Sequence, residues 1–246
     1  MDLVRETHRF YFKIALLAVL FAAAPARAQQ EVDDNTFHGD VMPYVIFGGL
    51  SGDMTIRNQT FPVNESASDI FKHLQFGFMT RSTVSYNRAF ISGDLMYVGL
   101  GGAGPLVNIG VDQWTGEALG GYRALPHFKA LAGVRYNNMT SKFRFQGPLA
   151  TVRSGSQTWW DPFVGFLSEF PFAEVFTASA RFDVGGFGVG SRIAVNAEPL
   201  INLHNNKHFT TSIGWKFLYQ DFVDSGKGFE YDVLMQGPMI GFTIKF

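Results

Sequence analysis

The C-terminal segment of the chain, residues 234–246, alternates between two kinds of side chain and ends on an aromatic ring. One face is apolar and consists of Leu234, Ile240, Phe242, Ile244 and Phe246, whereas glycine, threonine and lysine occupy most of the opposite face. A period of two places successive side chains on opposite faces of a β-strand. The segment is therefore predicted to be a strand with one apolar face, which needs an apolar environment.

The N-terminal 28 residues have the three parts of an export signal. Basic residues come first, an apolar run from Ile14 to Ala24 follows, and Ala26-Arg27-Ala28 ends the segment. This order is that of a secretory signal peptide, so we predict Sec-type export with cleavage after Ala28. The apolar run is too short to span a bilayer as a helix, which argues against an uncleaved anchor. Residues 29–246 then form one domain, and the apolar face of its last strand is expected to contact lipid.

Charge and cysteine content exclude several classes of function. The formal charge of the whole chain is −1, and segment 1–28 holds four Lys or Arg against two Asp or Glu residues, so the remainder carries −3. A nucleic-acid partner would require a clustered basic excess, and none is expected here. The chain has no cysteine, which excludes disulfides, thiol catalysis and thiolate metal sites.

Alternating segments recur along the chain after the export signal. We predict ten strands, at about 40–48, 74–86, 89–100, 112–123, 127–138, 157–168, 173–185, 191–203, 207–220 and 230–246. The connections are short or long in turn, with long loops at 49–73, 101–111, 139–156 and 221–229. Short periplasmic turns and long external loops are typical of an all-β fold, the transmembrane antiparallel up-and-down β-barrel. Both termini then lie in the periplasm, which requires an even strand number: ten, or eight or twelve if the ends are placed differently.

Outward aromatic residues recur eight positions apart. The pairs are Phe78 and Tyr86, Trp114 and Tyr122, and Phe128 and Tyr136. Eight residues span roughly 26 Å along a strand, or about 20 Å along the membrane normal at a tilt of about 40°. These rings are predicted to mark the two interfacial girdles. Trp159 and Trp160 are assigned to the outer girdle.

Three features fit a regular barrel poorly. In the first strand, Met42, Tyr44 and Ile46 compete with the alternate residues for the outer face. Proline removes a donor from the sheet, and Pro199 falls in the middle of a required strand. Residues 64–74 are predicted to form a short capped helix in the first long loop, packed against the barrel mouth.

The inward faces of the predicted strands carry many charges. We expect a lumen charge network of Arg81, Asp94, Glu117, Arg135, Asp161, Arg181, Asp183, Arg192, Glu198 and Lys216. A barrel of ten strands is narrow, and an unpaired charge inside it is costly. The favoured interpretation is a plug of ion pairs and hydrogen bonds. The alternative is a lining that selects ions or polar solutes.

Other motifs do not indicate chemistry. The glycine-rich run 185–190 lacks a following Lys-Ser/Thr and a helix, so a tight external hairpin is favoured over a phosphate site. His204 and His208 flank one turn without further metal ligands, and Ser154 and Ser156 have no His or Asp nearby in sequence. We expect no catalytic site, cofactor or metal.

The chain resembles small Gram-negative outer-membrane β-barrel proteins of the porin-like and surface-barrel kind. The resemblance covers residues 29–246 and rests, besides the cleavage site, on segments 120–123, 133–136, 160–163, 183–190 and 237–246. It implies residence in the bacterial outer membrane, with membrane lipid and lipopolysaccharide as partners. It also implies that Ile240, Phe242, Ile244 and Phe246 form the signal that the barrel-assembly machinery recognises.

The resemblance implies a cellular location more firmly than it implies a biochemical function. The omptin proteases and the lipid A deacylases are enzymes built on such barrels, but neither the Asp-His nor the Ser-His arrangement can be placed here. The leading hypothesis is a non-enzymatic barrel with a structural or surface-interaction role and an unidentified external ligand. A narrow pore for ions or small solutes is the first alternative, and a hydrolase acting on lipid or peptide is the second. A soluble, ligand-carrying periplasmic barrel is the structural alternative.

Overall fold

The computed structural model describes residues 35–56, 58–103, 107–145 and 152–246, and the predicted signal peptide lies outside them. The strands are β1 (Phe37–Ile46), β2 (Gly49–Ile56), β3 (Gln59–Glu65), β4 (Leu74–Tyr86), β5 (Ala89–Ala103), β6 (Val107–Leu125), β7 (Phe128–Phe145), β8 (Val152–Ala173), β9 (Phe176–Gly185), β10 (Ile193–His204), β11 (Phe209–Asp224) and β12 (Phe229–Lys245). The helix α2 (Ala67–His73) lies between β3 and β4.

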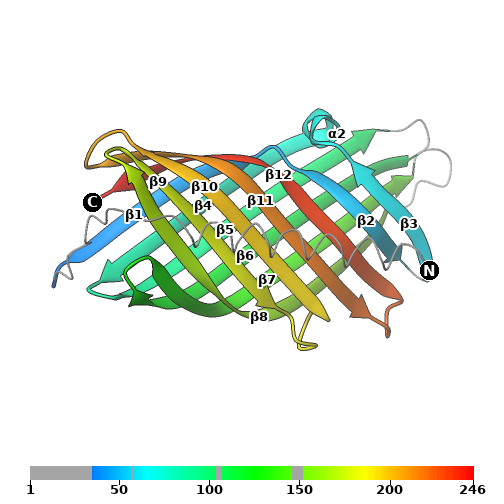
Figure 1. Ribbon diagram of the computed structural model, residues 1–246. Helices are drawn as coiled ribbons and strands as arrows, with labels where there is room; N and C mark the ends of the chain where they lie inside the picture. Colours follow the sequence, from blue (N-terminus) through cyan, green and yellow to red (C-terminus); the bar gives the residue numbers. More distant parts are fainter. Residues whose placement is uncertain (1–34, 57, 104–106, 146–151) are drawn as a thin grey trace, which may run out of the picture.

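Ten strands close into an antiparallel barrel (Figure 1). The order runs from β1 to β4 and then through β12 in sequence, and β12 pairs back with β1. The predicted fold class and strand number are confirmed. Strands β2 and β3 are additional and extend the sheet beyond β12.

The two ends of the barrel differ. Figure 1 shows the C-terminus at one end, here the inner end, and the β2–β3 hairpin at the other, the outer end. At the inner end, Gly39 and Phe246 exchange backbone hydrogen bonds of 3.0 and 2.9 Å between N–H and carbonyl oxygen. A Cβ on Gly39 would lie 2.5 Å from the Phe246 ring, so the ring packs closely over this glycine and would have to shift for any larger residue. The terminal residue therefore takes part in barrel closure.

Most of the predicted long loops are strands, so those loop predictions are wrong. Segments 49–56 and 59–65 form β2 and β3 of a hairpin, β7 continues to Phe145, and β11 continues to Asp224. Alternation persists in these segments with the faces exchanged: in β12, Tyr231 and Val233 are buried inside, whereas Asp232 lies between them on the other face. Sheet hydrogen bonds need no apolar outer face, so the strands continue where their outer side chains become polar.

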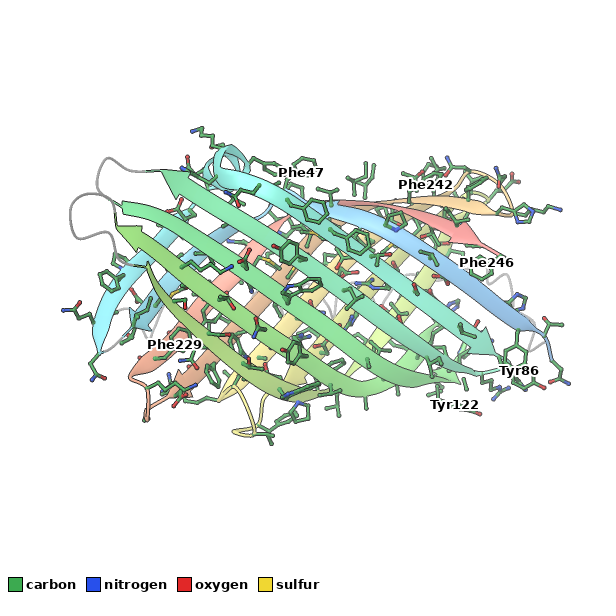
Figure 2. The ribbon with its side chains drawn as sticks, turned by 180° about the vertical axis from the view of Figure 1, so that it is seen from behind. Phe47, Tyr86, Tyr122, Phe229, Phe242 and Phe246 are labelled. Carbon is green, nitrogen blue, oxygen red and sulfur yellow. The ribbon has the colours of Figure 1, made fainter. Side chains whose placement is uncertain are left out.

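The outer face of the barrel is apolar over its middle. Ile91, Val164 and Ile213 are each more than half exposed. Aromatic rings contact each other at both borders of this region, with centroids 4.6 Å apart for Tyr97–Trp114, 4.7 Å for Tyr136–Trp160 and 4.7 Å for Phe37–Tyr86. Figure 2 shows Tyr86 and Tyr122, which are 42 and 53% exposed, toward the same end of the barrel. This arrangement is what the predicted girdles require.

The assignment of Trp159 to the outer girdle is wrong. Trp160 is 53% exposed, but Trp159 is 3% exposed and stacks on Phe222 inside the barrel, with ring centroids 4.5 Å apart. Neighbouring residues of a strand point to opposite faces, so only one of two adjacent tryptophans can join a girdle.

The uncertain strands are resolved by burial and pairing. Met42, Tyr44 and Ile46 point inward and are buried, whereas Val45 is 44% exposed. Strand β10 runs through Pro199, which pairs with Ala180 of β9, while the β10–β11 ladder skips this position. The missing N–H therefore removes ladder pairing on one side without shifting the register.

One stretch of the barrel wall lacks strand pairing. Strand β1 pairs with β4 only as far as Pro43 and Thr80, and β3 pairs with β2 alone. We call the unpaired stretch between β1–β3 and residues 74–79 of β4 the seam. It is a consequence of the hairpin, which takes the place beside β12 that β1 occupies nearer the inner end.

Helix α2 lies at the seam. Ser66 caps it by accepting a hydrogen bond from the Asp69 N–H, so the predicted helix is confirmed. It contacts β2 and β5, and Phe71 stacks on Phe47 of the outer wall with centroids 5.2 Å apart. The helix therefore lies on the side of the barrel and not at its mouth, which corrects the predicted position (Figure 1). No helix among the described residues is long and apolar enough to cross a membrane.

Candidate functional site

A layer of buried charges crosses the lumen, and every strand from β4 to β11 contributes to it. Nine of the ten predicted network residues lie here: Arg81, Asp94, Glu117, Arg135, Asp161, Arg181, Asp183, Glu198 and Lys216. We call these nine residues the charge layer. Alternation alone places each on the inner face of its strand, and closure of the barrel brings them together.

The first part of the charge layer is centred on Arg81 and Glu198. The Arg81 guanidinium donates from Nη1 and Nη2 to the two Glu198 oxygens at 2.6 and 2.9 Å, and from Nε to Asp94 at 2.8 Å. Lys216 Nζ donates to Glu198 at 2.9 Å, and the Tyr44 hydroxyl donates to Asp94 at 2.6 Å. Two cations thus face two carboxylates in a fixed geometry.

The second part is a ring of four charges. Arg135 donates to Glu117 at 2.6 Å and to Asp183 at 2.8 Å, and Arg181 approaches the same two carboxylates at 2.7 and 2.8 Å. The Phe163 ring packs against both guanidinium groups, 5.1 and 5.4 Å from its centroid. Each carboxylate therefore contacts two cations, and each cation contacts two carboxylates.

Asp161 is held by neutral donors. Ser191 donates from its backbone N–H at 2.6 Å and from its hydroxyl at 2.9 Å, and the Asn137 and Gln220 amides each donate at 3.2 Å. Ser191 belongs to the connection between β9 and β10, which contains the glycine-rich run 185–190. Gly185 ends β9 and residues 186–190 form a turn, so the predicted tight hairpin is confirmed, its external location stays a prediction, and Asp161 ties the turn to the barrel interior.

The charge layer is balanced apart from Asp161. Its four cations equal in number the four carboxylates that they contact, and all eight side chains are at least four-fifths buried. A buried ion is tolerated when its partners replace the water it has lost. The lumen at this level is therefore occupied by side chains that pair with one another, which is the arrangement of a plug, although Arg135 Nη1 and Arg181 Nε have no hydrogen-bond partner among the described residues.

Arg192 does not belong to the layer, which corrects its predicted place. Strand β10 begins at Ile193, so Arg192 falls in the turn before it. Its side chain is 58% exposed and contacts Asp221 at 2.6 Å and Glu230 at 2.8 Å. Outside the strand, alternation no longer determines where a side chain points.

Within the described residues, the lumen contains an inner cavity and an outer cavity, and residues of the charge layer help to line the inner one. The inner cavity has a volume of about 770 Å³ and a polar, charged lining that includes Arg123, Lys129 and Glu169. The outer cavity has a volume of about 450 Å³ and an almost entirely apolar lining. Barrel interiors are usually polar, so the apolar outer half is the unexpected part of this molecule.

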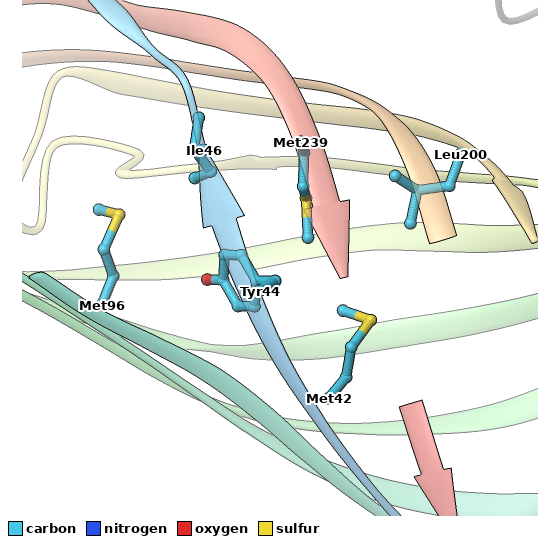
Figure 3. Close-up of a cluster of buried hydrophobic side chains, with 6 residues drawn as sticks. All are labelled: Met42, Tyr44, Ile46, Met96, Leu200 and Met239. Atoms are coloured by element: carbon cyan, nitrogen blue, oxygen red, sulfur yellow. The ribbon is translucent and has the colours of Figure 1, made fainter. Parts of the chain in front are cut away.

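Two clusters of buried hydrophobic side chains contribute to the walls of the outer cavity, and sequence reasoning missed them; Met42 and Leu200 of the first cluster line the inner cavity instead. One cluster consists of Met42, Tyr44, Ile46, Met96, Leu200 and Met239 (Figure 3). A second, toward the outer end, consists of Met139, Trp159, Phe222, Phe229, Tyr231 and Val233. The signal was present in β12, where the inward positions 231, 233, 235 and 239 are all large and apolar.

The predicted assembly signal lies on the outer face of β12. Ile240, Phe242 and Ile244 are 44, 44 and 40% exposed, and Phe246 is 75% exposed. Strand β12 is paired with β1 and β11 along this stretch, so its backbone is satisfied while its side chains face outward. Within the described residues, no group of three or more His, Asp or Glu side chains is placed to hold a metal ion.

Comparisons with known proteins find likeness in structure and none in sequence. No family model and no curated protein sequence matches the chain. The outer-membrane protease OmpT of Escherichia coli matches with a TM-score of 0.50 at 8% identity, over 89% of this chain and 100% of that one. The attachment invasion locus protein Ail of Yersinia pestis, in its complex with sucrose octasulfate, matches with a TM-score of 0.40 at 12% identity, over 85% and 98% of the two chains.

A third match extends over nearly the whole chain. The translocator domain of the autotransporter NalP of Neisseria meningitidis has a TM-score of 0.43 at 11% identity, over 98% of this chain and 97% of that one. At such identities the likeness concerns the fold and not the activity. The chain has the fold of the Gram-negative outer-membrane β-barrel proteins.

Proposed function

We propose that this chain is an integral protein of the bacterial outer membrane whose lumen is sealed, with a structural or surface-interaction role and no catalytic activity. The observation that carries the proposal is the charge layer. Eight of its side chains come from seven barrel strands, β4 to β7 and β9 to β11, and contact one another at 2.6–2.9 Å, while Asp161 of β8 is held by neutral donors. The exposed apolar band on the outer face supports residence in lipid.

Conductance of the refolded protein in planar bilayers tests the seal. We expect no stepwise openings from the wild-type protein, because ions would have to displace paired side chains. Stepwise openings from the folded wild-type protein would replace this proposal with the narrow-pore alternative.

A double variant serves as the positive control for that measurement. Arg81→Ser with Asp94→Ser removes one cation and one carboxylate and leaves Lys216 and Glu198 paired at 2.9 Å. The smaller, hydrated serines are expected to open a water path and to give stepwise currents. Arg192→Ser with Asp221→Ser, an ion pair outside the charge layer, is the matched control and should remain silent.

The absence of catalysis is tested separately, by incubating refolded protein with lipopolysaccharide and with peptide libraries. We expect no turnover of either. Any turnover that scales with protein concentration would favour the hydrolase alternative.

The assembly role of the C-terminal residues has its own test. Phe246→Ala removes the ring that covers Gly39 while keeping the backbone bonds that close the barrel. We expect slower assembly in the presence of the purified assembly machinery. Equal assembly rates for the variant and the wild type would refute the proposed signal.

A further inference from the structure

The outer cavity has the chemistry of a binding site for hydrocarbon. Its walls include Met79, Met96, Val98, Met139, Val233 and Met235. Methionine side chains are flexible and adapt to irregular apolar shapes. A cavity with such walls does not hold water well and gains free energy from an apolar occupant, at about 0.8 kcal/mol per buried CH₂ group.

The cavity reaches the outer wall of the barrel at the seam. Val45 and Phe71 both line it, yet they are 44 and 39% exposed. Val45 lies just beyond Pro43, the last residue of β1 that pairs with β4. Since no strand hydrogen bonds close the wall here, the cavity and the surroundings of the barrel meet at this point.

The seam lies at the height of the outer aromatic girdle. Gly77 lines the cavity, and its neighbours Phe76 and Phe78 point outward, 61 and 48% exposed. Phe76 contacts Tyr97, which in turn contacts Trp114, with centroids 5.8 and 4.6 Å apart. Aromatic girdles mark the boundary between headgroups and acyl chains. The opening therefore faces the acyl chains of the outer leaflet just below their headgroups.

The lining selects a chain and not a headgroup. No Lys or Arg is among the residues that line the cavity within the described parts of the chain. The Tyr44 hydroxyl, which lies at the bottom, is already bonded to Asp94 at 2.6 Å. A phosphate or sugar would find no cation inside, whereas a methylene chain would contact methionine and branched side chains over most of the wall, with Glu65, Gln113 and Ser141 as the polar exceptions.

We propose that the outer cavity binds one acyl chain of an outer-leaflet lipid, which enters sideways through the seam while its headgroup stays at the membrane surface. The charge layer limits how deep the chain reaches, because an apolar chain cannot replace the ion pairs. This inference concerns the outer half of the lumen and does not depend on whether the barrel conducts.

Gly77 offers a way to fill the cavity without strain. A Cβ at this position would lie 3.6 Å from Leu74 and 3.7 Å from the Tyr97 carbonyl oxygen, which are ordinary contacts. Gly77→Phe should therefore fold and occupy the space of the chain. Gly93→Phe is the matched control, because Gly93 lies on the opposite face of β5 from Asp94 and its Cβ would meet only the Glu117 carbonyl oxygen, at 3.8 Å.

Trp159 can report the occupant. It is 3% exposed and packs with Met139 and Val233, both of which line the cavity. Replacing the other three tryptophans, Trp114, Trp160 and Trp215, by phenylalanine leaves Trp159 as the only tryptophan. This protein is refolded into vesicles of phosphatidylcholine brominated near the end of one acyl chain, and its fluorescence is compared with that in unbrominated vesicles.

We expect brominated lipid to quench Trp159, with most of the quenching lost in Gly77→Phe and kept in Gly93→Phe. Val98→Phe, which fills the cavity from β5, should give the same loss, so that the result does not rest on one variant. Protease resistance in the vesicles verifies that each variant is folded. Unquenched Trp159, or equal quenching in the Gly77 and Gly93 variants, would overturn the proposal.

Discussion

The charge layer and the outer half of the lumen fill the same barrel in different ways. In the charge layer, every guanidinium and carboxylate needs a partner at a particular distance and direction, as in the ring of Arg135, Glu117, Arg181 and Asp183. In the outer half, methionine and branched side chains pack without direction and leave a cavity of about 450 Å³.

The difference also concerns the wall. The charged side chains come from strands that are mostly paired with their neighbours at that level, from β4 and β5 round to β11, although the β10–β11 ladder skips Glu198 and Pro199 and the β8–β9 ladder begins only at Phe163. The apolar half lies beside the seam, where pairing stops. Directional contacts require a rigid frame, whereas apolar packing tolerates an interruption in it. The following predictions test this contrast, beginning with the largest expected effect.

Removing Arg135 should be the most damaging single change. Its side chain is fully buried and contacts two carboxylates, so Arg135→Ala leaves both facing each other with one cation between them. We expect a loss of about 3–5 kcal/mol in the free energy of unfolding, measured by urea titration in micelles. The double variant Arg135→Ala with Asp183→Ala keeps the pair of Arg181 and Glu117 and should cost less. A greater cost for the double variant would contradict the pairing.

A deletion in the apolar half should cost less than the Arg135 change. Met239 is 1% exposed and packs in the cluster of Figure 3. Met239→Ala should lower the free energy of unfolding by about 2 kcal/mol, at the low end for buried methionine, because neighbours beside the cavity can move into the vacated space. The same urea titration measures it, and a cost above that of Arg135→Ala would reverse the comparison.

Tyr44 joins the two regions, since its ring lies in the apolar cluster and its hydroxyl donates to Asp94 at 2.6 Å. Tyr44→Phe keeps the ring and removes one charge-assisted hydrogen bond. We expect a loss of about 1.5 kcal/mol in the free energy of unfolding. An unchanged urea midpoint would mean that the Arg81 contact alone satisfies Asp94.

The smallest effect is expected at Arg192, which makes ion pairs at the outer rim while 58% exposed. Arg192→Ala should change the free energy of unfolding by no more than about 1 kcal/mol, and added salt should diminish the difference. A loss of unfolding free energy as large as that for Arg135→Ala would show that burial does not explain the difference between the two ion-pair sites.

Much of the barrel could be predicted because lipid imposes a local rule. An outward residue such as Ile213 is apolar and an inward one such as Lys216 can be charged, and this alternation is visible without knowing any partner strand. The same rule placed nine of ten charges inside. It failed at Arg192, which is outside a strand, and at Trp159, where two adjacent aromatic residues were assigned to one face.

The outer half of the lumen could not be predicted because the alternation of apolar outward and polar inward side chains does not hold there. Beyond the aromatic girdle the outer face need not be apolar. The sequence pattern of β2 and of the end of β7 therefore predicts loops where the structure has strands. The inward methionine and valine residues of β12 then had no predicted partners across the lumen.

The chain alone determined which side of most membrane-level strands faces outward, that the strand number is even with ten favoured, and that the interior charges must pair. Those features depend on residues near one another in sequence and on the medium around them. The seam, the hairpin beside β12 and the apolar cavity were decided by the tertiary structure. They depend on where one ladder ends and another begins between strands far apart in the chain, and no local pattern encodes that register.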